Sequence, residues 1–349
     1  MGINIRIFGE TMNIELKYKF KYPSVVAVLS ALTLLFGAIG ISYRAMGLIM
    51  MPVTSAFLAA LICVEKRRVA SITVSALLLI GEIVVGFIDY FTLTSLAVIS
   101  VAVIIAWHFL KKAEKAECAL LATLVTAIVI LATAILYILA STEASSLSEV
   151  YEEFLSIYAQ FKQDTIASVI EMTAETENAP AMYSPEYISS MFDSYLHYIV
   201  AIVAIGAFFL VGLSLKLFTG VTRRYLQNPD EINTWRFMPT TPFAYFYFAV
   251  AILSMFSTDP TDALSVSVAN LYLIFMFVFA YIGYVFVTAL LCKNGRSRLV
   301  TSILVLALAI ALSSLAIQVF AIIGAFTAVN IAKIKNNPKY FDNDTIPKE

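Results

Sequence analysis

The chain has 349 residues, of which 60% are hydrophobic and only 13% are charged. A soluble globular domain carries about 25% charged residues, so this composition excludes a water-soluble fold and predicts an integral membrane protein in a lipid bilayer. The net charge of −1 provides no basic field that would attract nucleic acid. We therefore expect no nucleic-acid partner.

Apolar runs of about the 20 residues that one helical crossing needs recur along the chain. The first follows a polar, mildly basic segment, 1–22, and is too long for a signal peptide, so we interpret it as an uncleaved first helix. The spans expected up to residue 292 are 23–42, 45–63, 70–88, 91–109, 118–140, 196–218, 242–257 and 265–292. The fold class that follows is an all-α membrane protein with about ten (8–10) transmembrane helices.

The last apolar run, 299–332, is too long for one ordinary crossing. A single helix over it would measure roughly 50 Å, against a hydrocarbon core of about 30 Å. We therefore expect two short helices with a turn near Ser313–Ser314. One tilted helix followed by a re-entrant piece is the alternative.

The basic residues predict the orientation of these spans. With the N-terminus inside and ten crossings, only Arg44 and Lys162 of the 23 Lys and Arg residues fall on the outer side. Lysine and arginine concentrate in cytoplasmic loops, and nine crossings would place the basic tail outside. The pattern therefore predicts that both the N-terminus and the C-terminus are cytoplasmic.

This topology divides the chain into two membrane blocks and three water-exposed segments. The expected parts are the N-terminal segment 1–22, a six-helix block 23–218 with an outer insertion 141–195, a basic cytoplasmic loop 219–241, a second block 242–332 and a tail 333–349.

The outer insertion is strongly acidic, with ten Asp and Glu residues against Lys162 alone. Ser146 and Glu149 form a capping-box pattern that predicts a helix start. Apolar residues then recur at spacings of three and four, which is typical of one face of an amphipathic helix: Leu147, Tyr151, Phe154, Tyr158 and Phe161. We expect this face to pack on the protein's own outer surface or on a partner. Ser184-Pro185 predicts a second helix start, leading into the sixth span.

The cytoplasmic loop 219–241 contains Trp235 and Arg236, and it ends in another predicted helix start at Thr241-Pro242. Five of the six positions from Phe243 to Phe248 are aromatic, which suits a belt at the membrane interface. Anchoring at the interface is one interpretation of this loop. Docking of a cytoplasmic partner through Trp235 and Arg236 is the other.

The third span carries the polar pattern of most interest for function. Ser71, Ser75, Glu82 and Asp89 recur at spacings that place them on one face of the helix. An ionisable residue inside a membrane is costly and faces a cavity or a partner. We expect Glu82, Asp89 and Ser75 to form an outward-opening ligand- or ion-binding stripe with Arg44, which could pair with Asp89. A hydrogen bond or salt bridge between helices, with no ligand, is the alternative.

Sequence patterns of catalysis are missing. There is no phosphate-binding loop and no H-E-x-x-H or G-x-S-x-G motif. Two histidines and three scattered cysteines give no metal-site or disulfide spacing. We predict no catalytic residue, no metal and no cofactor, and we do not expect an enzyme, although an intramembrane enzyme stays a third interpretation.

The first helix reads VVAVLSALTLLFGAIG, with Ala27 and Ala31 four residues apart. Together with the six-helix N-in, C-in block, it resembles the substrate-binding S-components of energy-coupling-factor vitamin transporters, and that resemblance implies that Ala27 and Ala31 dock a membrane coupling subunit. Over about residues 20–335 the chain resembles the YybS-like family of uncharacterised bacterial membrane proteins. This second resemblance rests on the same opening, the long outer loop, WRFMPTTPFAYF and AYIGYVFVTALLCKNGRSR, and it implies a multi-pass protein of the bacterial cell membrane.

Two functions follow as hypotheses. In the first, the chain is a transporter-type component that binds a small molecule and relies on separate ATPase machinery or an ion gradient, because it has no phosphate-binding loop of its own. In the second, it is a scaffold or regulator without transport activity, and it acts through the acidic outer helix and the basic cytoplasmic loop.

Overall fold

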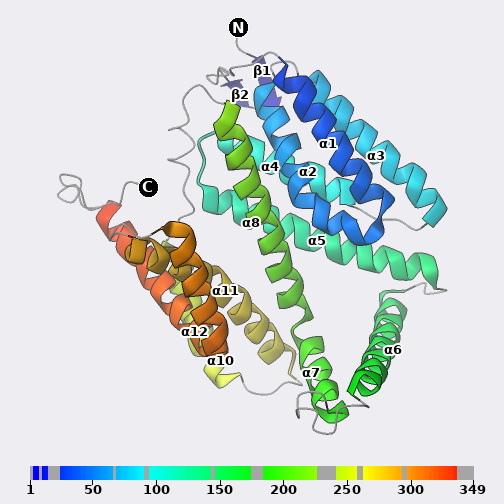
Figure 1. Cartoon of the computed structure of the whole chain (residues 1–349), viewed down its shortest axis with the longest axis vertical. Coiled ribbons are helices and arrows are strands. Elements are labelled where there is room, and N and C mark those ends of the chain that lie inside the picture. The colour runs from blue at the N-terminus through cyan, green and yellow to red at the C-terminus, as the bar shows by residue number, and fades with distance from the viewer. Residues whose placement is uncertain are drawn as a thin grey trace. The chain divides into compact units, whose positions relative to one another are not determined.

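The computed structural model describes residues 3–7, 10–14, 24–65, 68–89, 94–142, 146–173, 184–225, 241–257, 262–292 and 297–335. From Ser24 onward these residues are helical with short connections (Figure 1). Their contacts divide the chain into two compact units. Unit 1 comprises Met1–Ser189 and Gly206–Phe237, and unit 2 comprises Ser190–Ile205 and Met238–Glu349.

The described helices support an α-helical membrane protein. Five of them contain stretches long and apolar enough to cross a membrane: Val25–Ser42, Met46–Val64, Lys115–Leu139, Ile199–Arg223 and Ala263–Cys292. Shorter apolar stretches occupy Val69–Val85, Thr94–Leu110, Thr241–Phe256 and Leu315–Asn330. The helices therefore coincide with the predicted spans, whereas the number of crossings and the side on which each terminus lies stay predictions.

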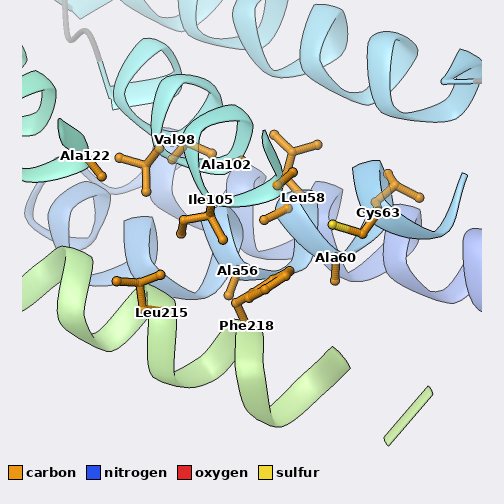
Figure 2. Close-up of a cluster of buried hydrophobic side chains, with 14 of the residues drawn as sticks. Ala56, Leu58, Ala60, Cys63, Val98, Ala102, Ile105, Ala122, Leu215 and Phe218 are labelled. Carbon is orange, nitrogen blue, oxygen red and sulfur yellow. The ribbon is translucent and has the colours of Figure 1, made fainter. Parts of the chain in front are cut away.

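Unit 1 contains α1 (Val25–Ser42), α2 (Arg44–Val64), α3 (Val69–Asp89), α4 (Thr94–Leu110), α5 (Lys115–Ser141), α6 (Leu147–Thr173) and most of α8 (Ile199–Tyr225). Helix α2 lies at its centre and packs extensively on α1 and α4. Figure 2 shows the core, in which Leu58 of α2, Ile105 of α4 and Phe218 of α8 are completely or almost completely buried. Small residues such as Ala56 and Ala102 surround them, which allows the helix backbones to approach closely.

Unit 2 is built on α10 (Thr241–Phe256), α11 (Ala263–Cys292) and α12 (Arg298–Lys335), with α11 packed most extensively on α12. Gly283 of α11 faces Gly324 of α12, and a Cβ at either position would overlap a backbone carbonyl of the other helix. Between α10 and α11, the ring of Tyr247 lies 5.1 Å from that of Phe279, and the ring of Phe246 lies 5.2 Å from that of Phe275. Aromatic residues at the start of α10 therefore pack within the unit.

The predicted turn near Ser313–Ser314 is wrong, because α12 is one helix of 38 residues. No glycine or proline interrupts residues 299–323, and serine is tolerated in a helix because its hydroxyl can bond to the carbonyl one turn earlier. A single helix here removes the turn on which ten crossings depended. If α12 crosses once, the described apolar helices make nine crossings, so the cytoplasmic C-terminus loses that support.

The helix predicted to run from Ser184-Pro185 into the sixth span is divided in two. Its start is confirmed, since the Ser184 hydroxyl accepts the Tyr187 N–H at 3.2 Å, but α7 (Pro185–His197) ends one residue before α8 begins. In unit 2, the side chain of Asn270 on α11 bonds to two backbone groups on either side of this break. Its Oδ1 accepts the Ala201 N–H at 2.9 Å and its Nδ2 donates to the His197 carbonyl at 2.8 Å.

Those two backbone groups are four residues apart and would bond to each other in a continuous helix. The buried amide of Asn270 has a donor and an acceptor, as a peptide group does, and it satisfies both at once. Insertion of a side chain into the helical ladder is a recognised cause of a kink. Asn270 therefore accounts for the break at Tyr198.

An element that the sequence analysis did not predict lies within residues 1–22. Strands β1 (Ile3–Ile7) and β2 (Glu10–Ile14) pair antiparallel, with Ile3 opposite Ile14 and Ile7 opposite Glu10. The alternation of isoleucine at positions 3, 5 and 7 has the period of two that is typical of a strand.

Candidate functional site

The strongest candidate in unit 1 is the junction of α3 and α4 around Glu82. This side chain is only 7% exposed, and its Oε2 accepts the backbone N–H of Ser95, the second residue of α4, at 2.9 Å. The Ser95 hydroxyl also donates to α3, to the Leu78 carbonyl one turn before Glu82, at 3.2 Å. Two hydrogen bonds, both donated by Ser95, therefore join the start of α4 to α3.

Glu82 lies where the N-terminal end of α4 can stabilise its negative charge. The first N–H groups of a helix lack partners within the helix and carry partial positive charge. The Glu82 carboxylate accepts one of these groups at the start of α4, so the helix end itself stabilises negative charge at that position. The alternative interpretation of Glu82, a hydrogen bond between helices, is therefore present as the bond to the Ser95 N–H. Ligand binding by Glu82 stays a prediction.

A small cavity of about 10 Å³ lies next to this junction. Its walls come from the first four helices of unit 1, and the lining residues are Gly37, Gly40, Ile41, Gly47, Met50, Met51, Thr54, Leu78, Thr94, Ser95 and Val98. A space of this size holds about one water molecule. The hydroxyls of Thr54, Thr94 and Ser95 give it polar groups.

Glycines make the close packing around this cavity possible. A Cβ on Gly37 would overlap the Leu78 side chain of α3. A Cβ on Gly40 would lie 3.3 Å from the Cβ of Met50, and one on Gly47 would lie 3.3 Å from the Thr94 hydroxyl. The absence of side chains at these three positions therefore helps helices α1, α2, α3 and α4 to pack closely.

The other members of the predicted stripe do not all join Glu82. Ser75 is half-buried on α3. Ser71 is buried near the other end of that helix, where its hydroxyl donates to Glu65 at 3.0 Å. Arg44 and Asp89 are terminal residues of α2 and α3, and their side chains lie outside the described part of the chain, so their pairing stays a prediction.

A second helix-capping carboxylate, which the sequence analysis missed, is Glu65. It directly follows α2, and its two oxygens accept the N–H groups of Ala70 at 2.6 Å and Ser71 at 2.8 Å at the start of α3. Its separation of five and six residues from these groups is longer than the usual capping spacing. The turn between the helices, where Arg68 has a φ of 57°, brings the carboxylate back.

The predicted docking pair on α1 lies on the outward side of unit 1. Ala27 and Ala31 are both exposed, whereas Val25, Leu29 and Thr33 of the same helix are buried. The side chain next to the pair, Val28, is 46% exposed. The small-residue face and the core-facing side of α1 are therefore different.

The remaining predicted residues contribute less to a site. Trp235 and Arg236 lie outside the described residues, which resume at Thr241, the first residue of α10. The ammonium of Lys111 lies 4.2 Å from the centroid of the Trp107 ring, and His108 bonds to the Ile104 carbonyl at 2.9 Å. Among the described residues, no group of three His, Cys, Asp or Glu side chains is arranged to hold a metal ion.

Comparison of the chain with protein-family models, with curated proteins and with solved structures finds no match.

Proposed function

We propose that this chain is a multi-pass protein of the bacterial cell membrane and the small-molecule-binding component of a transport system. The observation that carries the proposal is a buried carboxylate, Glu82, in an apolar helix, bonded to a residue, Ser95, that lines a small and mostly apolar cavity. Ionisable groups at such positions are costly, and proteins retain them mainly where a substrate, an ion or a partner uses them.

The size of the cavity sets a condition on binding. It admits about one water molecule, whereas sites for small organic ligands usually measure about 300–1,000 Å³. A ligand could therefore reach Glu82 only if the outer ends of the helices around the cavity moved apart. The ligand-free protein would be closed, and binding would open it.

Energy would come from a separate membrane subunit, because the chain has no phosphate-binding loop. The exposed pair Ala27 and Ala31 supports docking through α1, since small side chains let a partner helix approach its backbone. Leucine at either position would block that approach without disturbing the buried side of α1. Leucine at Val28, which is already large and exposed, is the matched control.

The test uses the full-length protein purified in mild detergent from its native membrane. We expect mass spectrometry to find a small molecule with the wild type and to find it lost in Glu82→Gln, a variant that keeps an oxygen for the Ser95 N–H. We also expect a membrane subunit to co-purify with the wild type and with Val28→Leu but not with Ala27→Leu or Ala31→Leu. If neither a small molecule nor a membrane subunit co-purifies with the wild-type protein, the proposal is rejected.

A further inference from the structure

Helix α6 carries an apolar face that the described part of unit 1 covers only in part. Its start is confirmed, with the Ser146 hydroxyl accepting the Glu149 N–H at 3.3 Å. Among its described side chains only Val150 is buried. Tyr151 is 59% exposed, Phe161 is 61% exposed and Met172 is 80% exposed. Phe154 and Tyr158 are half-buried, so the described part of unit 1, in which α6 follows α5 as a separate helix (Figure 1), covers this face only in part.

Four acids lie along one edge of this face. Glu149, Glu153, Asp164 and Glu171 are separated by four, eleven and seven residues, and each of these spacings returns to nearly the same side of a helix with 3.6 residues per turn. The opposite edge carries Lys162. We call the first four residues the acidic edge.

We infer that α6 is a docking surface for a cationic amphipathic helix of a partner protein. The apolar stripe of the partner helix would pack on the apolar face of α6, and the Lys or Arg residues of the partner would lie against the acidic edge. Apolar side chains at spacings of three and four are those through which two helices pack. The negative charge around α6 favours a cationic partner. Like charges repel, so ten acids against one lysine in the outer segment disfavour a second copy of this chain and an anionic lipid surface.

The size of the face predicts a transient interaction. A helix of 27 residues is about 40 Å long and 10 Å wide, so it offers roughly 400 Å², about half of what each partner contributes to a stable interface. This inference does not depend on the proposed transport function, since it concerns a different part of unit 1 from Glu82 and α1.

The test uses the full-length protein in nanodiscs of zwitterionic phosphatidylcholine and a fluorescent 18-residue amphipathic peptide of leucine and lysine as the probe. Empty nanodiscs provide the blank, and a shuffled peptide of the same composition without an apolar face is the control. We expect the amphipathic peptide to bind above the blank and the shuffled peptide not to.

Two variants separate the charge from the apolar face. Glu153→Gln/Asp164→Asn/Glu171→Gln and Ile157→Ser/Met172→Ser should each bind the peptide about tenfold more weakly, because three exposed charge pairs or two apolar contacts are lost. Glu152→Gln, on the far side of the helix, should bind within twofold of the wild type. Circular dichroism confirms that each variant keeps its helices.

The inference is overturned if the charge variant binds as the wild type does, or if the shuffled peptide binds equally well. It is also overturned if Ile157→Cys forms disulfide-linked dimers in the absence of peptide, which would identify a second copy as the occupant. A fluorophore on that cysteine that reports immersion in lipid would identify the membrane and would reject the inference in the same way.

Discussion

Replacement of Asn270 by leucine, which has a similar volume, should destabilise unit 2. The amide makes three hydrogen bonds, but the Val266 carbonyl, which accepts the third at 2.8 Å, also belongs to the α11 ladder and keeps a partner there. The variant therefore orphans two groups, the Ala201 N–H and the His197 carbonyl. Each buried orphan costs about 1–3 kcal/mol in soluble proteins, whereas hydrogen bonds between membrane helices average about 0.6 and reach about 1.7 kcal/mol.

We expect a loss of about 2 kcal/mol, at the lower end of the sum for two orphans. The free energy of unfolding can be measured by circular dichroism as sodium dodecyl sulfate is added to the protein in mild detergent. Leu271→Ala, at a neighbour on α11 that is 40% exposed, removes no such bond and is the control. A variant Asn270→Leu that unfolds with the wild-type free energy, while spin labels on α7 and α8 report an unchanged break, would refute our account of this residue.

Three further changes test the packing and the capping described above. Gly283→Ala should destabilise the protein by about 1–3 kcal/mol in the same titration, because its Cβ overlaps the Phe320 carbonyl, whereas Gly212→Ala, with open space around its Cβ, should be neutral or slightly stabilising. Glu82→Leu should lose about 1 kcal/mol as a cap of α4, and Glu82→Gln should lose less because it keeps an acceptor; equal losses would contradict a capping role. Glu65→Ala should cost about 1–2 kcal/mol and speed amide hydrogen exchange at Ala70 and Ser71.

Helix positions followed from local features of the sequence. The length of each apolar run set the predicted spans, and the side chains of Ser146 and Ser184 marked the starts of α6 and α7 through hydrogen bonds to N–H groups three residues ahead. Such bonds depend on neighbours in the chain and can therefore be predicted.

Interactions between distant residues could not be predicted in the same way. Glu82 was singled out from its depth in an apolar run, but its partner, the N–H of Ser95, lies thirteen residues away across a change of chain direction. The role of Asn270 was not predicted, because its partners lie 69 and 73 residues earlier in the chain. A lone asparagine in an apolar run was the available signal, since such a group needs hydrogen-bond partners.

The sequence by itself determined that this protein belongs in a membrane and where its helices lie, because both depend on the hydrophobicity of contiguous residues. Only the tertiary structure decided how the buried polar groups are satisfied and where helices break or continue. A carboxylate or an amide can be satisfied by any donor or acceptor that the fold brings within about 3 Å. Which one meets it depends on helix packing, which brings together residues far apart in the chain, as Gly283 and Gly324 show.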